Sequence, residues 1–291
     1  MITAPPLPES VPDGKLAPVC GRYALRTGAA DLVEEFEVDE DTVGGTPGSA
    51  EGAPGLNVAP TTSPPVVLER VPKGEPEALP VRSLRRLRWG LVPSWAKDPS
   101  VGNRMVNARV ETLLEKPAFA KAAVARRCLV PVDAWYEWQR SPLAEGAGGK
   151  PRTQPFAVRS RDGSRLSLAG IYEFWRDRDR PDDDPDRWLV SFAIITTEAE
   201  PGLDRLHDRM PLVVPADLRD AWLEPERAEP EEVREVLEAV PRDLFETALD
   251  AFPVSRRVGN VRAQDPGLLD PAPAAELEGV VDLRTGEVIG S

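Results

Sequence analysis

A series of short strand-like runs dominates the middle of the sequence, and helical patterns do not alternate with them regularly. These runs cover residues 66–71, 85–92, 128–132, 156–159, 166–175, 188–197 and 210–214. A parallel sheet with helices on both faces needs a helix between successive strands. The order therefore predicts an α+β fold with a largely antiparallel sheet, and nothing clearly marks a second domain.

Short helical patterns flank these runs. Thr27 is expected to N-cap one helix, and Pro117 suits the first position of another. Two further helices are expected at residues 216–223 and 229–240. The connections rich in Gly, Pro and Asp at 141–153 and 177–187 are typical of hairpin loops.

The composition excludes several classes of protein. Two Cys and one His in 291 residues cannot build the usual zinc shells, and no Gly-rich phosphate loop is present, so no metal and no cofactor are expected. No stretch reaches the ~20 apolar residues that span a bilayer, so no membrane partner is expected. The N-terminus lacks the basic and apolar regions of a secretory signal. We therefore expect a reducing, cytoplasmic location, which argues against a disulfide between Cys20 and Cys128.

The charge is unevenly distributed along the chain. The net charge is −13, but residues 82–127 hold eleven Lys and Arg against three acidic residues. That segment is therefore +8, and the rest of the chain is −21. A basic zone in an acidic protein can bind phosphates locally while the bulk charge suppresses non-specific binding to DNA. Solvated charges on a helix and two strands explain the composition equally well.

Three residues are candidates for acid, base or nucleophile. The thiol of Cys20 can be a nucleophile if nearby cations such as Arg22 favour its thiolate. Glu137 lies among three aromatic residues, and a carboxyl group in an apolar pocket has a raised pKa that suits proton transfer. His207 precedes Asp208, which could orient its ring. The alternatives are a solvent-facing Glu at a strand end and a surface His.

Other side chains are candidates for binding a polyanion. Asn107 and Arg109 are two residues apart and share a face on an extended strand. Arg109, together with Arg22 and Arg209, could hold phosphates in bidentate geometry. The tryptophans at 89 and 95 could stack on bases, although core packing is expected for at least one of them.

Together, these segments resemble the SOS response-associated peptidase (SRAP) family, the abasic-site processing proteins, over roughly residues 20–260. The resemblance rests on an ordered set of motifs: CGRY (20–23), NVAPT (57–61), RWGLVPSWAKD (88–98), NARVET (107–112), KPAF (116–119), RCLVP (127–131), YEW (136–138), AGIYE (169–173), FAIITT (192–197) and HDRMP (207–211). It implies the SRAP fold, with a barrel-like sheet core and short flanking helices. The implied organisation is a leader of residues 1–19, a SRAP domain of residues 20–262 and a C-terminal extension of residues 263–291.

The resemblance also implies a function. Family members bind single-stranded DNA at an abasic site and form a covalent thiazolidine crosslink through an N-terminal Cys, here Cys20. Glu137 would manage the protons of the amine and the imine in this lyase-type Schiff-base chemistry. His207 would assist opening of the sugar ring and reversal of the crosslink, and Asn107 would position the amine or the sugar. The implied DNA contacts come from Arg22, Trp89, Arg109 and Arg209.

The leader of residues 1–19 is a departure from the family pattern, in which the Cys directly follows the initiator Met. Three explanations are open. Translation can begin at Val19, because GUG is a bacterial start codon, and 30 Arg against 6 Lys suggest a GC-rich genome. The leader can instead be removed by autoproteolysis, the peptidase activity that the family name records. If the leader persists, the α-amine of Cys20 is an amide and thiazolidine chemistry is impossible.

Three functions therefore stand at this point. The first is an abasic-site sensor and crosslinker in the SOS response to DNA damage, expected to be a cytoplasmic, nucleoid-associated monomer. The second is a Cys-dependent peptidase or autopeptidase, which is a hydrolase. The third is a non-catalytic module that binds single-stranded DNA.

Overall fold

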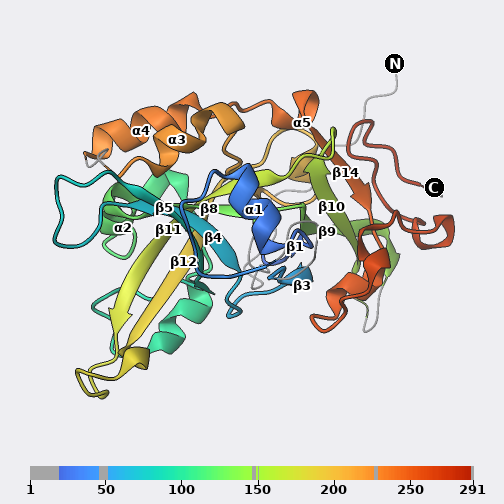
Figure 1. The fold of residues 1–291 in the computed structure, drawn as a ribbon. Coiled ribbons are helices and arrows are strands. Elements are labelled where there is room, and N and C mark those ends of the chain that lie inside the picture. Colours follow the sequence, from blue (N-terminus) through green and yellow to red (C-terminus); the bar gives the residue numbers. More distant parts are fainter. Residues whose placement is uncertain (1–19, 46–51, 146–148, 150, 226–228, 290–291) are drawn as a thin grey trace.

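The computed structural model describes residues 20–45, 52–145, 149, 151–225 and 229–289, and the predicted leader lies outside them. The chain forms two sheets with helices at the periphery (Figure 1). One sheet has five strands in the order β14 (Leu249–Pro253), β10 (Pro151–Ser160), β9 (Ala134–Glu145), β1 (Tyr23–Leu25) and β3 (Gly55–Val58). Trp135 of β9 pairs with Tyr23 of β1, which brings the start of the described chain to this sheet.

The second sheet has nine strands and is the longer of the two. Its main path is β13 (Arg209–Pro211), β12 (Trp188–Glu198), β11 (Leu166–Arg176), β8 (Arg127–Val132), β4 (Pro65–Arg70), β5 (Val81–Arg86) and β2 (Glu40–Asp41). Two short strands, β6 (Arg88–Trp89) and β7 (Asn107–Arg109), add to β12 in parallel. Apart from these and β2 with β5, the strand pairs are antiparallel. The predicted α+β class with a largely antiparallel sheet is confirmed, although neither described sheet closes into a barrel.

The helices are short and lie outside the sheets (Figure 1). They are α1 (Ala29–Glu35), α2 (Ala120–Ala125), α3 (Arg219–Leu223), α4 (Pro230–Ala239) and α5 (Leu244–Thr247). The N-cap of α1 is Gly28, not Thr27. The hydroxyl of Thr27 instead donates to the carboxylate of Asp133, 3.2 Å away, so the predicted cap makes a tertiary contact.

Two strand predictions need correction. The run 85–92 is expected from its sequence to be one strand, but it divides into the end of β5 and the short β6, and the chain turns away at Gly90. Gly90 has φ +124°, and an added Cβ would lie 2.6 Å from the carbonyl oxygen of Gly102, so a larger residue does not fit. The strand β9 is absent from the predicted runs, because its aromatic and charged residues do not alternate simply.

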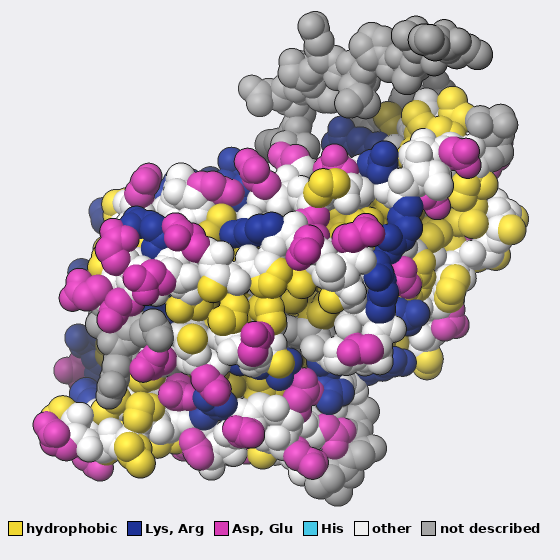
Figure 2. Space-filling view, turned by 90° about the horizontal axis from the view of Figure 1, so that it is seen from above, with side chains coloured by type: hydrophobic (Ala, Val, Ile, Leu, Met, Phe, Trp, Pro, Cys, Tyr) yellow, Lys and Arg dark blue, Asp and Glu magenta, His cyan; other side chains and the backbone are white. Residues whose placement is uncertain are grey.

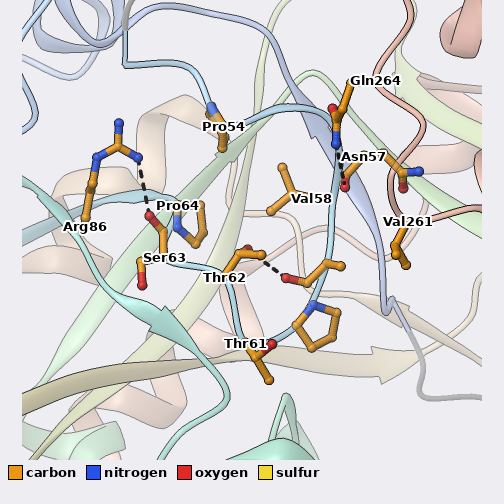
Figure 3. A pocket seen from close by; sticks show the side chains of 12 residues that line it. Pro54, Asn57, Val58, Thr61, Thr62, Ser63, Pro64, Arg86, Val261 and Gln264 are labelled. Carbon is orange, nitrogen blue, oxygen red and sulfur yellow. Dashed lines mark hydrogen bonds between the residues drawn. The ribbon is translucent and has the colours of Figure 1, made fainter.

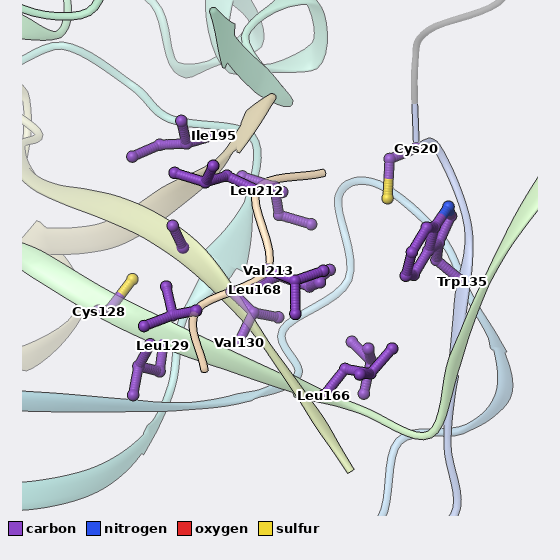
Figure 4. Close-up of a cluster of buried hydrophobic side chains, with 14 of the residues drawn as sticks. Cys20, Cys128, Leu129, Val130, Trp135, Leu166, Leu168, Ile195, Leu212 and Val213 are labelled. Atoms are coloured by element: carbon purple, nitrogen blue, oxygen red, sulfur yellow. The ribbon is translucent and has the colours of Figure 1, made fainter. Parts of the chain in front are cut away.

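The side chains of β9 alternate between two hydrophobic cores. Trp135 belongs to the larger core, which lies between the sheets and includes Cys20, Cys128 and residues of β8, β11 and β12. Tyr136 belongs to a smaller core on the other face with Ala157 and Val254. Figure 4 shows Cys20 beside Trp135 at one side of the larger core and Cys128 at the other. Both cysteines are free, as expected.

The described part of the C-terminal extension packs against the body of the protein. The side chain of Gln264 accepts a hydrogen bond from the amide of Leu56 and donates to the carbonyl of Asn57, so it satisfies the outer edge of β3. The other edge strand, β14, is covered in the same way, because the amide of Ala272 donates to Pro253. Leu268 is fully buried in the smaller core. None of the helices in the described ranges is long and apolar enough to cross a membrane.

We predict that Gly170→Ala destabilises the fold through the contact between β11 and β8. An added Cβ would lie 2.8 Å from the sulfur of Cys128, and overpacking of this kind costs about 1–3 kcal/mol. Urea denaturation of Gly170→Ala, Cys128→Ala and the double variant measures the coupling. We expect the double variant to recover part of the loss, because the sulfur is gone. Gly259→Ala, where nothing lies within 4 Å of the added Cβ, is the control. Strictly additive losses would contradict the contact.

Candidate functional site

The central contact of the site joins the start of the described chain to β9. The backbone nitrogen of Cys20 donates a hydrogen bond to a carboxylate oxygen of Glu137, at 2.7 Å. The antiparallel register of β1 and β9 explains this contact, because Tyr23 lies opposite Trp135 and the chains continue in opposite directions. Cys20 precedes Tyr23 by three residues, and Glu137 follows Trp135 by two. The register therefore brings the backbone nitrogen of Cys20 and the carboxyl group of Glu137 together.

Glu137 is almost fully buried, with a relative exposure of 5%. Burial raises the pKa of its carboxyl group to about 8, against the opposing effect of the hydrogen bond from Cys20. The charge of Asp208 also raises this pKa, so the turn that carries His207 lies close enough to act on Glu137. The expectation of a raised pKa for this carboxyl group is confirmed. Such a group can accept and return a proton near neutral pH.

Cys20 is fully buried, and its backbone has φ +43°, a left-handed conformation that is uncommon for a residue with a side chain. Burial, with a smaller effect of the Glu137 charge, raises the pKa of its thiol well above the ordinary value. The idea that Arg22 favours a thiolate at this position is therefore wrong for this structure. Burial therefore favours the protonated thiol, and a thiolate would form only if a partner accepted its proton.

Arg22 is held by other groups. Its guanidinium donates to the side chain of Asn57 at 2.9 Å and to the carbonyl of Val258 at 3.2 Å, and it lies over the ring of Trp138. The amide group of Asn57 in turn donates to the carbonyls of Val258 and Asn260. Asn57 is not among the site residues expected from the sequence. Its place in the NVAPT motif is the signal that could have identified it.

His207 lies in the turn before β13 and is partly buried. Its Nδ1 is 2.5 Å from a carboxylate oxygen of Asp208 and also accepts a hydrogen bond from the backbone amide of Arg209, at 3.1 Å. The two contacts need opposite states of Nδ1, because a protonated nitrogen donates to the carboxylate and an unprotonated one accepts from the amide. The presence or absence of a proton on Nδ1 therefore determines which of the two hydrogen bonds forms.

Trp89 is part of the core rather than the surface. It is fully buried, its indole nitrogen donates to the carbonyl of Val106 at 2.9 Å, and its ring stacks on Phe192 with centroids 6.3 Å apart. In this conformation its ring offers no surface for stacking on a base, contrary to the expected DNA contact. Trp95, the other tryptophan of the same motif, is 60% exposed.

The phosphate-binding candidates differ in their surroundings. Asn107 and Arg109 lie on β7, which pairs with β12, and Arg109 is exposed. Arg209 is nearly buried, and its guanidinium makes two hydrogen bonds of 2.8 Å to the carboxylate of Glu111 and one to the carbonyl of Thr196. A phosphate would have to compete with Glu111 for Arg209. Glu111 belongs to the NARVET motif of residues 107–112, and this motif is the sequence signal that could have identified the pair.

The basic zone of residues 82–127 is partly neutralised. Its arginines at 82, 85 and 126 form ion pairs with acidic residues elsewhere in the chain, namely Glu69 and Asp220, Glu40, and Glu173. On the face drawn in Figure 2, acidic and basic side chains are interspersed rather than separated. The segment charge of +8 therefore overstates the local potential.

A surface pocket of about 500 Å³ lies beside Asn57, and it is lined mainly by the loop that follows β3. Figure 3 shows Thr61, Thr62 and Ser63 along one side of it, with Arg86 donating to the carbonyl of Ser63. Thr61 has φ +72°, which fixes an unusual turn in this loop. In the part of the chain that the structure describes, no group of three His, Cys, Asp or Glu side chains is arranged to hold a metal ion.

The structure thus brings some of the predicted residues together. Cys20 and Glu137 are in direct contact, and Asp208, next to His207, acts on the same carboxyl group. Arg22 and Arg209 are engaged by protein groups, and Trp89 is in the core.

We predict that the stability of the full chain falls as pH rises, because of Glu137. The pKa of its carboxyl group is raised from 4.5 to about 8 on folding, so the folded state binds the proton more tightly than the unfolded state. This contribution is complete below pH 4.5 and is lost as pH rises towards 8, with a limiting slope of about 1.4 kcal/mol per pH unit. Urea denaturation across this range should show the slope in the natural chain but not in Glu137→Gln. Parallel curves for the two proteins would rule out a buried proton on Glu137.

The sequence model of the family "SOS response associated peptidase (SRAP)" matches residues 19–261. Among curated relatives, the Abasic site processing protein YoqW of Bacillus subtilis is 33% identical over 253 residues, covering 87% of this chain and 99% of the relative. The Abasic site processing protein HMCES of Rattus norvegicus is 29% identical over 248 residues, covering 75% of this chain and 65% of the relative.

Solved structures support the same assignment. A protein from Bacteroides thetaiotaomicron superposes with a TM-score of 0.68 at 23% identity, over 87% of this chain and all of that one, which shows the shared fold. A phage-related protein from Bordetella bronchiseptica superposes with a TM-score of 0.57 at 27% identity, over 81% of this chain and 95% of that one. The chain therefore belongs to the SOS response associated peptidase (SRAP) family.

Proposed function

We propose that this protein processes abasic sites in single-stranded DNA by forming a covalent crosslink through Cys20, as part of a DNA-damage response. The single observation that supports it best is the 2.7 Å hydrogen bond between the backbone nitrogen of Cys20 and Glu137. When Cys20 is the first residue, that nitrogen is a primary amine in contact with the buried carboxyl group of Glu137. The names of the relatives, which are abasic site processing proteins, point to the same substrate.

The first step is attack of the Cys20 amine on the C1′ aldehyde of the ring-opened abasic sugar. An ammonium group is not a nucleophile, so its proton must leave first. Glu137 would accept this proton in its ionised form, which the positive charge of an adjacent ammonium group favours. The resulting carbinolamine loses water to give a Schiff base. Glu137 returns the proton to the departing hydroxyl group, so the carboxyl group ends this step as it began.

The second step is ring closure by the thiol. The sulfur of Cys20 adds to C1′, the C=N bond becomes a C–N bond, and the thiol proton passes to nitrogen. One amine, one thiol and one aldehyde thus become a five-membered thiazolidine and one water. Because burial raises the pKa of this thiol, a free thiolate is disfavoured before the substrate arrives. Closure therefore depends on the adjacent electrophilic carbon and on proton transfer.

The remaining predicted residues have supporting roles in this proposal. His207, with Asp208 at 2.5 Å, would transfer the proton that opens the sugar ring and assist reversal of the crosslink. Asn107, on the strand next to β12, would position the amine or the sugar. Arg109 is exposed and could contact phosphate directly, whereas Arg22 and Arg209 would first exchange their protein partners. An abasic site offers no base, so binding needs only contacts with phosphate, sugar and neighbouring bases.

The proposal requires a free α-amine on Cys20. A peptidase that removes residues 1–19 is compatible with it, because removal would create that amine. A Cys-dependent peptidase acting through a stable thiolate is less well supported, because burial holds the thiol protonated.

We predict that protein beginning at Cys20 forms a heat-stable adduct with single-stranded DNA containing one abasic site. Denaturing gels resolve the adduct, and mass spectrometry should show the mass of both components less one water. Cys20→Ser should abolish the stable adduct, because the ring cannot close through sulfur. Glu137→Gln should slow its formation by about a hundredfold or more, as expected for loss of a general acid–base group.

Glu173→Gln is the matched control for this assay, because Glu173 is also nearly buried but pairs with Arg126. It should form the adduct at the natural rate. Protein that retains residues 1–19 should form no thiazolidine, and its mass before and after incubation reports any removal of the leader. A stable adduct that survives Cys20→Ala would refute the mechanism. Intact DNA and no adduct with the protein beginning at Cys20 would refute the function.

We predict further that Glu111→Gln strengthens binding to intact single-stranded DNA. Loss of the negative charge weakens the contact between residue 111 and Arg209, so the guanidinium of Arg209 becomes available to a phosphate. The slope of log affinity against log salt should steepen by about one phosphate contact. Glu115→Gln is the control, since it makes the same charge change at an exposed position in the same segment. Equal effects of the two variants would mean that the ion pair does not restrain Arg209.

A further inference from the structure

The segment of residues 279–286, here termed the C-terminal clamp, has a defined structure of its own. The carboxylate of Asp282 accepts hydrogen bonds from the amides of Arg284 and Thr285, and the amide of Gly286 donates to the carbonyl of Asp282. The bridge between Val281 and Val288 closes the turn. Leu283 is nearly buried in the larger core. The clamp lies beyond residue 261, where the family match ends.

One end of the clamp holds β9. The side-chain amide of Gln139 donates to the carbonyl of Val281 at 2.9 Å, and its oxygen accepts from the amide of Val281 at 2.7 Å. The hydroxyl of Ser141 donates to the carbonyl of Gly279 at 2.7 Å. Alternate residues of a strand share a face, so these two side chains lie on the same face of β9 as Glu137. The clamp therefore continues the row of contacts that begins at Cys20 and Glu137.

The other end of the clamp holds the loop that leads to His207. The guanidinium of Arg205 donates to the carbonyl of Leu283 at 2.5 Å. An added Cβ on Gly202 would lie 3.0 Å from the same carbonyl and 2.6 Å from the ring of Phe245, so the loop and the clamp are in close contact. The amide of His207 donates to the carbonyl of Leu203, within the short helix of residues 203–205. The position of this helix therefore sets the position of His207.

These two attachments connect the sheets. Glu137 belongs to the five-stranded sheet, whereas His207 precedes β13 of the nine-stranded sheet. Figure 1 draws the C-terminal residues, in red, on the side of the molecule formed by β10 and β14. A segment attached to both β9 and the loop before His207 can keep Glu137 and His207 at a fixed distance from each other. A displacement of about 1 Å between catalytic groups can lower the rate a hundredfold.

We propose that the C-terminal clamp positions His207 relative to Glu137, with Arg205 and Gln139 as positioning residues at its two ends. The significance of this arrangement for catalysis rests on the proposed function. The geometric statement does not, because it concerns the protein without DNA.

The test uses the fact that His207 is the sole histidine of the chain, so its ring gives a single unambiguous NMR signal. We compare its ¹H–¹³C chemical shift and line width in the natural protein, Arg205→Ala, Arg205→Lys and Gln139→Ala. The two alanine variants should move or broaden the signal, although Gln139 is attached to β9 rather than to the loop. Arg205→Lys should restore the natural signal, because an ammonium group can still donate to the carbonyl of Leu283.

Arg256→Ala is the matched control. Arg256 pairs with Glu276, a residue of the C-terminal extension that lies outside the clamp. It should leave the signal unchanged. Thermal unfolding of each variant shows that it is folded; Arg205 is exposed, so its replacement is not expected to prevent folding. An unchanged signal in Arg205→Ala would overturn the proposal. A signal that moves in Arg205→Ala but not in Gln139→Ala would also overturn it, since the clamp would then support only the loop.

Adduct formation supplies the second measurement. With saturating abasic DNA, Arg205→Ala should lower the rate constant about tenfold while affinity for intact single-stranded DNA stays the same. A changed affinity with an unchanged rate constant would contradict a positioning role. Failure of the natural protein to form any adduct would reject the proposed function, but it would leave the NMR comparison valid.

Discussion

The hydrogen bond between the Cys20 backbone nitrogen and the Glu137 carboxyl group joins two positions 117 residues apart in the chain. It depends on the register of β1 and β9, in which Tyr23 lies opposite Trp135. A slip of one residue would turn every side chain of β9 to the other face, and Glu137 would then point into the smaller core. The two cores that receive Trp135 and Tyr136 fix this register, because each face of β9 is specified by packing. The candidate chemistry is thus a consequence of core packing.

Burial acts in the same direction on the carboxyl group of Glu137 and on the thiol of Cys20. It raises the pKa of the Glu137 carboxyl group to about 8 and the pKa of the Cys20 thiol well above its ordinary value. Each group is therefore favoured in its neutral form, and the resting site avoids placing two negative charges side by side in a medium of low dielectric. A site of this kind is stable without substrate. Under the proposed function, reaction would begin when an abasic sugar supplies the aldehyde that the amine and the thiol of Cys20 attack.

Sequence patterns predicted the strand-rich α+β fold, because β-branched and aromatic runs indicate strands whatever their partners are. They also indicated the raised pKa of Glu137 from its aromatic neighbours. They did not predict the partners of charged side chains. The ion pair of Arg209 with Glu111 spans 98 residues, and the contacts of Arg22 with Asn57 and Val258 span 35 and 236. The sequence also did not predict that Trp89 is buried. A motif that mixes polar and apolar residues looks the same in sequence whether its tryptophan packs inward or faces solvent. The roles assigned to the site residues remain predictions for the experiments above.

The edge strands of the five-stranded sheet are β14 and β3, and the C-terminal extension covers both. The side chain of Gln264 makes one accepted and one donated hydrogen bond along the edge of β3, and the amide of Ala272 donates one hydrogen bond to the carbonyl of Pro253 in β14. Exposed strand edges are templates on which another chain can add, and such addition leads to aggregation. A protein truncated near residue 262 would present both edges at once. The extension can therefore be understood as protection against self-association, in a fold whose candidate reactive residue, Cys20, lies three residues before β1, the strand that pairs with the protected edge strand β3.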